Sequence, residues 1–519
     1  MNKKLIYSRS DGETIKLIGR NSRLSLLQIE IVKEKIQAAF PGINVIVISR
    51  ISKGDVMQNT LLHTIEGKDF FTQDIFDALT INEADIAVHS LKDMSSEHFF
   101  GSNKFAVVDR NDVRDVAIFN QDIEEKLRQG ETIIVGTCSP RREEMATVFL
   151  KKALPQLNSE IKIEIKPIRG NVETRLRKLS NGEYDATILA TAGLNRLLES
   201  QKDKSAIKEL LADKKLMLLP LIECVPAPCQ GAIVAEANPH NRKAIEILEK
   251  INEENLFADC FAEKKEAIKY GAGCIQKFGV TTIDTKHGKY QYAAGVDTEG
   301  TEFVKWNDFH DKEIAKANLF STTDVMKDFF DYEWEKRKIK IERPVVFVAN
   351  YKAVTGRSEN SYFNGKKILA SGTKTWFELA KLGYWVSASA DALGFEFLLS
   401  SLKMPLFNLQ KNDITILTHE TAAERWKKKG YDAVSSYRLL LRKNEFIEQK
   451  ISTADSIFWS SYSQFEFYRK YTKQGINHLC AGGETAELLI AASVSPIVFP
   501  TIKSFLQWRN YSIRSHNVA

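Results

Sequence analysis

Cysteine is scarce in this chain, and the cysteines are not spaced as a metal site or a disulfide framework requires. Only 6 of the 519 residues are cysteine. No CxxC pair occurs among them, and they are Cys138, Cys224, Cys229, Cys260, Cys274 and Cys480. Neither a zinc or other metal site nor a disulfide-stabilised secreted fold is therefore supported, and a reducing cytoplasm is the expected compartment.

Long apolar runs are also absent. No uncharged apolar stretch approaches the roughly 18 residues that a membrane-spanning helix needs. The first residues, MNKKLIYSRSDGE, lack the apolar core of a signal peptide. We therefore expect a cytoplasmic protein that does not enter a membrane.

Neither a strong charge imbalance nor a nucleotide-binding motif is present. Lys and Arg total 73 against 67 Asp and Glu, so the net charge of +6 is too small to indicate nucleic acid by itself. The phosphate loop GxxxxGK[ST] and the dinucleotide fingerprint GxGxxG do not occur. A nucleotide is thus not the expected ligand.

What the first 235 residues contain is a regular alternation of short apolar strands and amphipathic helices, which is typical of parallel sheets covered by helices. A helix over 24–40 is predicted by apolar residues at helical spacing, namely Leu26, Ile29, Val32, Ile36 and Phe40. Strands are predicted at 15–19, 43–51, 85–88, 132–136, 161–168 and 185–190. Two small α/β units joined by crossovers are the expected result.

The remaining chain has a different pattern. A helix near 240, a strand region over 280–297 and a charged helix over 324–340 are expected, followed by a linker at 341–344. The tail contains an internal repeat, because VFVANY resembles IFWSSY and ILASGTKTWFELAKLGYWV resembles HLCAGGETAELLIAASVSPIV. We expect two related strand, turn and helix halves that face each other across a cleft.

Arginines gather at three turns that follow predicted strands. The turns are GRNSR at 19–23, GTCSPRREE at 136–144 and RGNVETR at 169–175. Each offers backbone N–H groups at a helix start, a guanidinium and a nearby hydroxyl, which together favour carboxylate or phosphate. Because ligands of open α/β sheets bind at the carboxyl ends of the strands, the three turns are expected to converge on a ligand with several negative groups.

These same stretches carry a family resemblance. GRNSRLSLLQ, DIAVHSLKDMS, VGTCSPRRE, IRGNVETRLRKLSNGEYDATILATAGLNRL, APCQGAIVAE and AGC resemble the hydroxymethylbilane synthases, also called porphobilinogen deaminases, over about 15–335. The tail, about 340–519, resembles the uroporphyrinogen-III synthases in the turn at 482–487 and in IFWSSYS, although the strand that normally opens that fold is not evident. The chain is interpreted as a fusion of two consecutive enzymes of tetrapyrrole synthesis.

The resemblance implies an α/β fold with four parts. Two periplasmic-binding-protein-like α/β domains are expected at 14–112 plus 218–238 and at 113–217. A small α+β third domain carrying the cofactor cysteine is expected at 239–338. A shortened, two-lobed α/β module like uroporphyrinogen-III synthase is expected at 340–519.

The family joins four porphobilinogen molecules head to tail, with loss of ammonia, on a covalently bound dipyrromethane. Every pyrrole ring bears an acetate and a propionate, so the growing chain is a polyanion that needs many cationic partners. The resemblance therefore assigns cofactor binding to Ser90, Thr137, Ser139, Arg141, Arg142 and Arg175. It assigns substrate binding to Arg20, Ser22, Lys68, Arg169, Arg196 and Gln230.

Asp93, Lys92 and Cys274 carry the chemistry that the resemblance implies. Expelling ammonia leaves a cation on the substrate, which the Asp93 carboxylate stabilises while it also accepts and returns protons. Lys92 holds carboxylates and keeps Asp93 ionised. Cys274, in YGAGC, attaches the dipyrromethane through a thioether, and the preceding small residues let a bulky bipyrrole approach the backbone.

The tail leaves several alternatives open. Its expected cleft residues are Thr375, Ser460, Ser461, Tyr462 and Thr485. Tyr462 is either a proton donor or a buried tyrosine with a satisfied hydroxyl. The module is either a trimmed active cyclase or a degenerate one that holds the product or supports assembly.

A different class of function is also compatible with the first two domains. A two-lobed anion-binding receptor has a similar architecture, but the missing export signal and the Lys92–Asp93 pair argue against it. We expect a monomer that acts on porphobilinogen, without nucleic acid or membrane.

Overall fold

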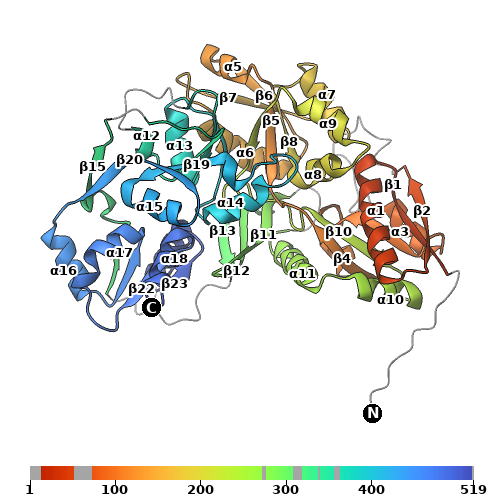
Figure 1. Cartoon of the computed structure of the whole chain (residues 1–519). Coiled ribbons are helices and arrows are strands. Elements are labelled where there is room, and N and C mark those ends of the chain that lie inside the picture. Colours follow the sequence, from red (N-terminus) through yellow and green to blue (C-terminus); the bar gives the residue numbers. More distant parts are fainter. Residues whose placement is uncertain are drawn as a thin grey trace. The chain divides into compact units, whose positions relative to one another are not determined.

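The computed structural model describes residues 13–51, 73–271, 276–307, 318–336, 339–355 and 363–516 (Figure 1). The chain forms two compact units. The first contains Met1–Phe149, Ile161–Thr282 and Tyr292–Lys305. The second contains Leu150–Glu160, Ile283–Gln291 and Trp306–Ala519.

The first unit begins with a five-stranded sheet in the order β2-β1-β3-β10-β4. Its strands are β1 (Thr14–Arg20), β2 (Asn44–Arg50), β3 (Ile86–Ser90), β4 (Lys104–Arg110) and β10 (Ala232–Ala237). β1 runs parallel to β2 and β3, whereas β10 runs antiparallel to β3 and β4. The sequence predicted a parallel sheet, and the exception is β10, which enters from more than 100 residues further along the chain.

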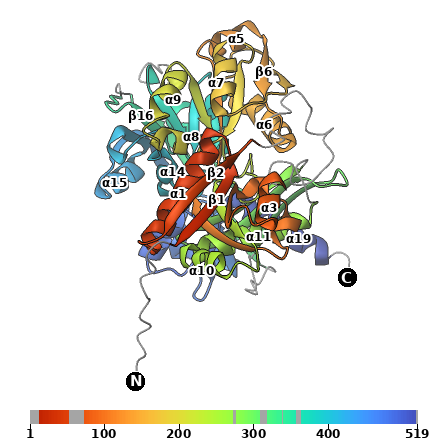
Figure 2. The same ribbon diagram turned by 90° about the vertical axis from the view of Figure 1, so that its right-hand side faces the viewer.

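Helix α1 (Arg23–Ala39) covers this sheet and lies over β1 and β2 in Figure 2. Ile29, Val32 and Ile36 are buried in the core, as the periodicity predicted. Leu26, which was expected on the same face, is 37% exposed. The first turns of α1 instead bury Gln28, whose amide Nε2 donates to Ser90 Oγ at 2.7 Å. Polar contacts therefore replace core packing where α1 begins.

A second five-stranded sheet has the order β7-β6-β8-β5-β9. Its strands are β5 (Asp115–Phe119), β6 (Thr132–Gly136), β7 (Lys162–Lys166), β8 (Ala186–Ala190) and β9 (Lys215–Leu218). Its helices are α5 (Ile123–Gln129), α6 (Pro140–Ala153), α7 (Val172–Ser180), α8 (Thr191–Glu199) and α9 (Lys204–Leu211). Here β5 is the antiparallel strand, so the two sheets share one topology. The antiparallel strand of each sheet follows, along the chain, a strand of the other sheet: β5 comes after β4, and β10 comes after β9.

Residues after β10 form two helices and a three-stranded sheet. The helices are α10 (Arg242–Ile251) and α11 (Glu254–Ile268). The sheet has the order β11-β12-β13, with strands at Lys277–Thr285, Gly288–Val296 and Glu302–Asn307. The expected single helix near 240 is thus two helices.

The C-terminal part contains two further sheets. The smaller has the order β14-β21-β22-β23 and is parallel throughout, with strands at Leu319–Ser321, Ser456–Trp459, Asn477–Ala481 and Ile497–Phe499. The larger has the order β15-β20-β19-β16-β17-β18. Its strands lie at Phe330–Trp334, Asp432–Leu441, Ile414–His419, Val345–Val348, Lys367–Ala370 and Val386–Ser389.

The charged helix expected over 324–340 was wrong. Where the structure describes residues 319–340, they form β14, a short 3-10 turn at Met326–Asp328 and β15. β14 pairs with β21, and β15 pairs with β20. Both strands therefore pair with strands of the C-terminal sheets, and the sequence did not predict either of them.

The internal repeat has a structural counterpart. β16, β17 and β18 are adjacent parallel strands with α13 (Thr373–Lys381) between the second and third. β21, β22 and β23 are likewise adjacent and parallel, with α18 (Glu484–Ala491) in the same place. The other helices of this region are α12 (Lys352–Thr355), α14 (Phe395–Leu402), α15 (Glu420–Lys428), α16 (Glu445–Thr453), α17 (Tyr462–Tyr468) and α19 (Ile502–His516).

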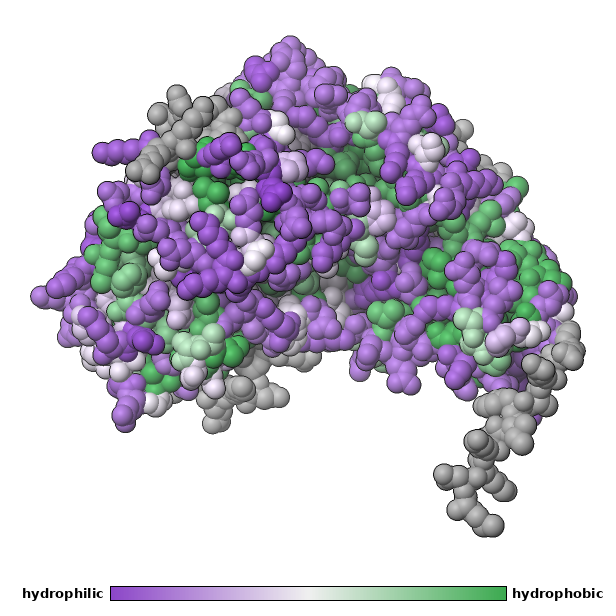
Figure 3. Space-filling view, viewed as in Figure 1, coloured by the Kyte–Doolittle hydropathy of each residue, from purple (hydrophilic) through white to green (hydrophobic). Residues whose placement is uncertain are grey.

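Among the described residues, no helix is both long and apolar enough to span a bilayer. Hydrophilic side chains predominate on the face shown in Figure 3, and the hydrophobic ones form separate patches.

Candidate active site

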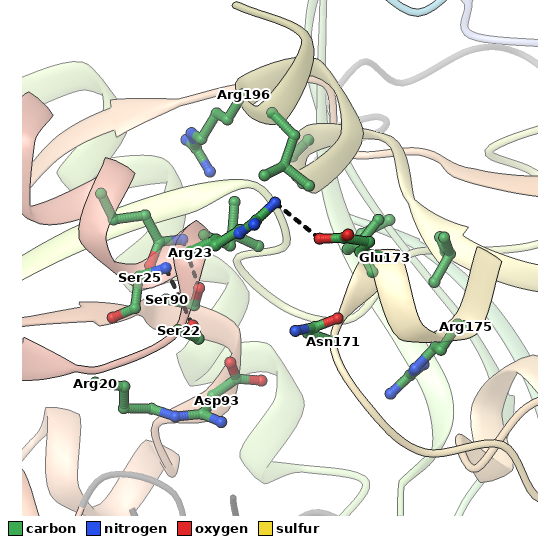
Figure 4. Close-up of a pocket in the computed structure, with 18 of the residues that line it drawn as sticks. Arg20, Ser22, Arg23, Ser25, Ser90, Asp93, Asn171, Glu173, Arg175 and Arg196 are labelled. Atoms are coloured by element: carbon green, nitrogen blue, oxygen red, sulfur yellow. Dashed lines mark hydrogen bonds and ion pairs between the residues drawn. The ribbon is translucent and has the colours of Figure 1, made fainter. Parts of the chain in front are cut away.

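A cavity of about 620 Å³ lies in the first unit. It is lined by residues from both of the regions that contain a five-stranded sheet. β1 and β3 end at it, and α1, α7 and α8 begin at it. Figure 4 shows Arg20, Ser22, Ser90 and Asp93 on one side, with Asn171 and Arg175 opposite them. The carboxyl ends of strands and the starts of helices thus converge here, which is where open α/β sheets bind ligands.

Side-chain caps fix the two helix starts that face the cavity. Ser22 Oγ accepts from Ser25 N at 3.2 Å at the start of α1, and Asn171 Oδ1 accepts from Thr174 N at 2.9 Å at the start of α7. Gly170, just before the second cap, has a φ of +113°, a conformation that disfavours any residue with a Cβ. These caps hold the turns that carry Arg20, Arg23 and Arg175.

Lys92 and Asp93 lie together on a single turn, Leu91–Asp93, directly after β3. The buried Leu91 anchors this turn, while both polar side chains line the cavity. Burial lowers the pKa of Lys92, as do Arg142 and Arg141, whereas the neighbouring Asp93 raises it. The ammonium therefore depends on nearby anions, and Asp93 is one of them.

Two of the lining arginines are buried and held by carboxylates and carbonyls. Arg142 donates to Asp115 Oδ1 at 2.8 Å and to Ile188 O at 3.0 Å. Arg196 donates to Asp109 Oδ2 at 2.6 Å and to Gly231 O at 2.7 Å. Such fixed guanidinium groups are pre-organised for an anionic ligand.

Arg175 lines the cavity together with other guanidinium groups. Its Nε donates to Gly170 O at 2.9 Å. Burial, together with the charges of Arg142 and Arg169, lowers the pKa of Arg175 to about 10. A guanidinium that loses proton affinity in this way is stabilised by an anion bound beside it.

Asp115 is a buried carboxylate that accepts hydrogen bonds from several side chains but does not line the cavity itself. It accepts from Arg141 at 2.7 Å, from Arg142 at 2.8 Å and from Gln230 at 2.9 Å. Burial alone would raise the pKa of Asp115, but the two arginines lower it well below its usual range. Asp115 therefore stays ionised and holds Arg142 in place.

The structure brings together most of the residues predicted for the site. Those that line the cavity are Arg20, Ser22, Ser90, Lys92, Asp93, Arg142, Arg169, Arg175 and Arg196. Lys68 and Cys274 lie outside the described residues.

Four of the predicted residues are not among those that line the cavity, and their side chains bond within the protein: Thr137, Ser139, Arg141 and Gln230. Arg141 is 4% exposed, and its guanidinium is taken up by Asp115 and by Val225 O at 2.6 Å. Gln230 likewise bonds Asp115 and Val113 O. Thr137 Oγ1 accepts from Ser139 N, and Ser139 Oγ accepts from Arg142 N, so both hydroxyls shape the turn before α6.

The sequence reading missed several lining residues. Arg23 and Glu173 form an ion pair of 2.8 Å, drawn as a dashed line in Figure 4. Cys138, Gln28 and Asn171 also line the cavity. Arg23 and Glu173 stand inside the quoted motifs GRNSR and RGNVETR, so their position in those turns was the signal that could have identified them.

Comparison with known proteins gives the family. The protein-family model described as "Porphobilinogen deaminase, dipyromethane cofactor binding domain" matches residues 15–246 of the chain. A probable porphobilinogen deaminase of Pyrobaculum islandicum is 33% identical over 291 residues, which cover 56% of this chain and 89% of that protein. The chain belongs to the porphobilinogen deaminase family.

Other similarities agree with this assignment or add nothing to it. The porphobilinogen deaminase of Streptococcus sanguinis is 32% identical over 293 residues, which cover 56% of this chain and 89% of that protein. A solved structure, a probable amino-acid ABC transporter extracellular-binding protein from Bacillus subtilis, aligns with 14% identity. It covers 50% of this chain and 97% of that protein, but its TM-score of 0.27 is too low to bear on function.

The matched region is the dipyrromethane cofactor binding domain of the deaminase family, and the described residues fit that group. A dipyrromethane carries several acid side chains, and the cavity presents Arg20, Arg142, Arg169, Arg175 and Arg196. Arg142 Nε and Arg196 Nε are buried and make no hydrogen bond within the described residues. The donor set therefore suits a polyanionic ligand.

The five residues that the sequence predicted for a cleft in the C-terminal part all lie in the second unit. Thr375 Oγ1 is 3.2 Å from Ser371 Oγ, and Ser460 Oγ donates to Gln464 Oε1 at 2.8 Å. Ser461 caps α17, Tyr462 is its first residue, and Thr485 lies in the first turn of α18. The guanidinium carbon of Arg425 lies 5.7 Å from the centre of the Tyr462 ring.

Proposed function

We propose that this chain is a hydroxymethylbilane synthase that joins four porphobilinogen molecules into a linear tetrapyrrole, releasing ammonia at each step. The observation that carries the proposal is the position of Asp93 in a cavity whose lining is rich in guanidinium groups. Within the described part of the chain Asp93 forms no ion pair, whereas the neighbouring Glu173 is paired with Arg23 and Arg177. Asp93 is thus the lining carboxylate that remains available to a cation.

The arginines bind and orient the substrate. Each porphobilinogen brings an acetate and a propionate, which Arg20, Arg169 and Arg175 pair with through charge-assisted hydrogen bonds. Arg142 and Arg196, held by Asp115 and Asp109, present fixed guanidinium edges to the same groups. Orientation of this kind lowers the entropic part of the barrier to joining two rings.

Asp93 acts on the reacting centre. Loss of ammonia from porphobilinogen leaves a positive charge that is shared with the pyrrole nitrogen. A carboxylate fixed beside that nitrogen stabilises the charge in the transition state and receives the proton that leaves when a new bond forms. Lys92, on the same turn, binds a substrate carboxylate.

The dipyrromethane is proposed to be attached to Cys274, and when bound it supplies the pyrrole carbon that reacts with the first porphobilinogen. The family assignment favours this enzyme over the two-lobed anion-binding receptor. A cytoplasmic monomer without nucleic acid or membrane partners is part of the proposal and rests on sequence composition.

We also propose that the C-terminal module cyclises the linear product to uroporphyrinogen III. β14 supplies the opening strand that the sequence resemblance lacked, and the two related strand and helix repeats support a two-lobed module. The proposed first deaminase domain contains residues 14–112 and 218–238, and the second contains residues 113–217. The proposed third domain runs from residue 239 to about 317. The C-terminal module then begins at β14 instead of residue 340.

Incubation of the full-length protein with porphobilinogen tests both activities. The expected result is loss of porphobilinogen with release of an equal amount of ammonia, and recovery of type III as the cyclic isomer. If porphobilinogen is consumed but only the type I isomer is recovered, the C-terminal module is not a cyclase. If porphobilinogen is not consumed, the deaminase proposal is wrong.

A further inference from the structure

Arg23 differs from the other arginines around the cavity in its exposure and its partners. Its side chain is 50% exposed, whereas the side chains of Arg142 and Arg196 are 10% and 4% exposed and are held by buried groups. Arg23 Nη1 lies 2.8 Å from Glu173 Oε2 and 3.3 Å from Asp203 Oδ1. An arginine with half its surface in water can change partners at little cost.

The Arg23–Glu173 pair spans the cavity. Arg23 is the first residue of α1, which packs on the first sheet, and Glu173 is in the first turn of α7, beside the second sheet. Both side chains line the cavity, and Figure 4 shows them pointing toward each other across it. The pair therefore connects the two halves between which a ligand lies.

The charge of Arg23 is poorly placed for helix stability, which favours an anionic partner. A cation at a helix N-terminus is opposed by the helix dipole, and the first turn of α1 contains no acidic residue. Glu173, in contrast, is well placed in the first turn of α7. The helix dipoles therefore make the ion pair more favourable for Arg23 than for Glu173, which its own helix already stabilises.

Glu173 retains a partner when Arg23 leaves. Its other oxygen, Oε1, lies 2.8 Å from Arg177 Nη2, one turn along the same helix. Asp203, which is 5% exposed, also remains near Arg23 and limits how far the guanidinium moves. Release of the Arg23–Glu173 contact therefore leaves neither side chain as an unpaired buried charge.

We propose that Arg23 exchanges Glu173 for a carboxylate of the bound substrate, so that substrate binding opens the ion pair that connects the two halves. This inference rests on the proposed function, because that function supplies the carboxylates. Arg23 is then a substrate-binding residue, and Glu173 is its competitor.

The competition predicts shifts of opposite sign. In the full-length chain with Asp93→Asn, where bond formation stops, the Kd of porphobilinogen is measured by titration calorimetry. Glu173→Gln frees Arg23 and is expected to lower Kd about threefold, the scale of an exposed ion pair. Arg23→Gln is expected to raise Kd about tenfold because a charge-assisted contact is lost. Arg23→Lys is expected to recover most of that loss.

Matched controls remove the same charges from an ion pair outside the cavity. Arg128 and Glu125 pair on α5, with side chains 58% and 54% exposed, and neither lines the cavity. Arg128→Gln and Glu125→Gln are expected to leave Kd unchanged. In the chain that retains Asp93, the same order is expected for KM, with kcat within about twofold.

Two results would overturn the inference. One is a shift of Kd in the same direction for Arg23→Gln and Glu173→Gln, which indicates that the pair only stabilises the fold. The other is no shift beyond that of the controls. Failure of the proposed function is a separate result, since an unmodified chain that consumes no porphobilinogen rejects that function whatever the Kd values are.

Discussion

Asp93 and Lys92 follow the same strand, and their environment gives them different tasks. Burial lowers the pKa of Lys92 and makes its charge dependent on neighbouring anions. Asp93 lies in the same cavity without an ion-pair partner among the described residues. A carboxylate surrounded by cations remains available for a transient positive charge, and this availability is the basis of the proposed chemistry.

Replacement of that carboxylate tests its role. Asp93→Asn keeps the size of the side chain but removes the charge and the basic oxygen, so porphobilinogen consumption is expected to fall at least 100-fold. The unfolding temperature is expected to stay within about 2 °C of that of the unmodified chain, because Asp93 supports no ion pair in the described structure. Asp122→Asn, on an exposed side chain that does not line the cavity, is the matched control. A variant at Asp93 with more than a tenth of the activity contradicts the assignment.

A buried carboxylate on β10, which pairs with β3, makes the stability of the first sheet depend on pH. Glu236 is fully buried and accepts from His89 Nε2 at 3.0 Å, His98 Nε2 at 2.6 Å and Asn103 Nδ2 at 2.6 Å. Burial alone would raise the pKa of Glu236, but the hydrogen bonds from the two histidines lower it to about 2. The ionised form therefore stabilises the sheet beneath Lys92 and Asp93.

The sign of the pH dependence follows from the lowered pKa. The stabilisation by Glu236 is fully present above its ordinary pKa of 4.5 and is lost as pH falls from there to about 2. Glu236→Gln places an amide donor against a histidine donor and is expected to cost about 2 kcal/mol at pH 7. Thermal unfolding of both proteins between pH 7 and pH 3 is expected to show the difference narrowing below pH 4.5. A difference that does not change with pH contradicts the account.

Some residue roles could be predicted from sequence and others could not. The three arginine-bearing turns were predicted because each follows a strand and begins a helix, and their lining residues do meet. Arg141 and Gln230 were assigned to the ligand, but both side chains bond Asp115. Asp115 is the first residue of a buried strand, and nothing in its sequence neighbourhood indicates that it gathers three polar partners from distant positions.

At the scale of elements, the periodicity of apolar residues predicted β6 and α1 closely, because these elements have a clear local pattern. β6 occupies the predicted residues, Thr132–Gly136, and α1 nearly so. The stretch FDYEW was interpreted as part of a charged helix, yet its burial alternates with a period of two, as in a strand with one face covered. Its partner β20 lies about 100 residues later, and such a pairing leaves no local signal.

The turn before α7 offers a test of how an element positions the site. A Cβ on Gly170 would lie 2.6 Å from Thr174 Cγ2, and Gly170 O accepts from Arg175 Nε. Gly170→Ala is expected to displace Arg175 and raise the KM for porphobilinogen about tenfold, through loss of a charge-assisted contact. Gly182→Ala is the control, because Gly182 also has a positive φ, of +76°, but open space around its Cβ position. An equal effect of both changes contradicts the steric explanation.

At the scale of the whole molecule, the chain combines a deaminase with a second α/β module. The C-terminal sheets draw β14 and β15 from before the predicted linker, so the boundary cannot be located from composition alone. Two repeats of three parallel strands are the structural counterpart of the internal sequence repeat.

Tyr462 permits a test of the second module that leaves the first unchanged. If its hydroxyl gives a proton during ring closure, Tyr462→Phe is expected to lower the share of the type III isomer at least tenfold without changing porphobilinogen consumption. Tyr471→Phe, at a tyrosine outside the predicted cleft set, is the control. An unchanged type III share assigns Tyr462 a packing role only.

The most direct test of the central claim, a pyrrole chain tethered in a guanidinium-rich cavity, is the intact mass of the purified protein. Produced in cells that make porphobilinogen, the full-length chain is predicted to exceed its sequence mass by one dipyrromethane. The excess is predicted to vanish in Cys274→Ala and to persist in Cys138→Ala, the cysteine that lines the described cavity. A mass equal to that of the amino acids alone would contradict the account.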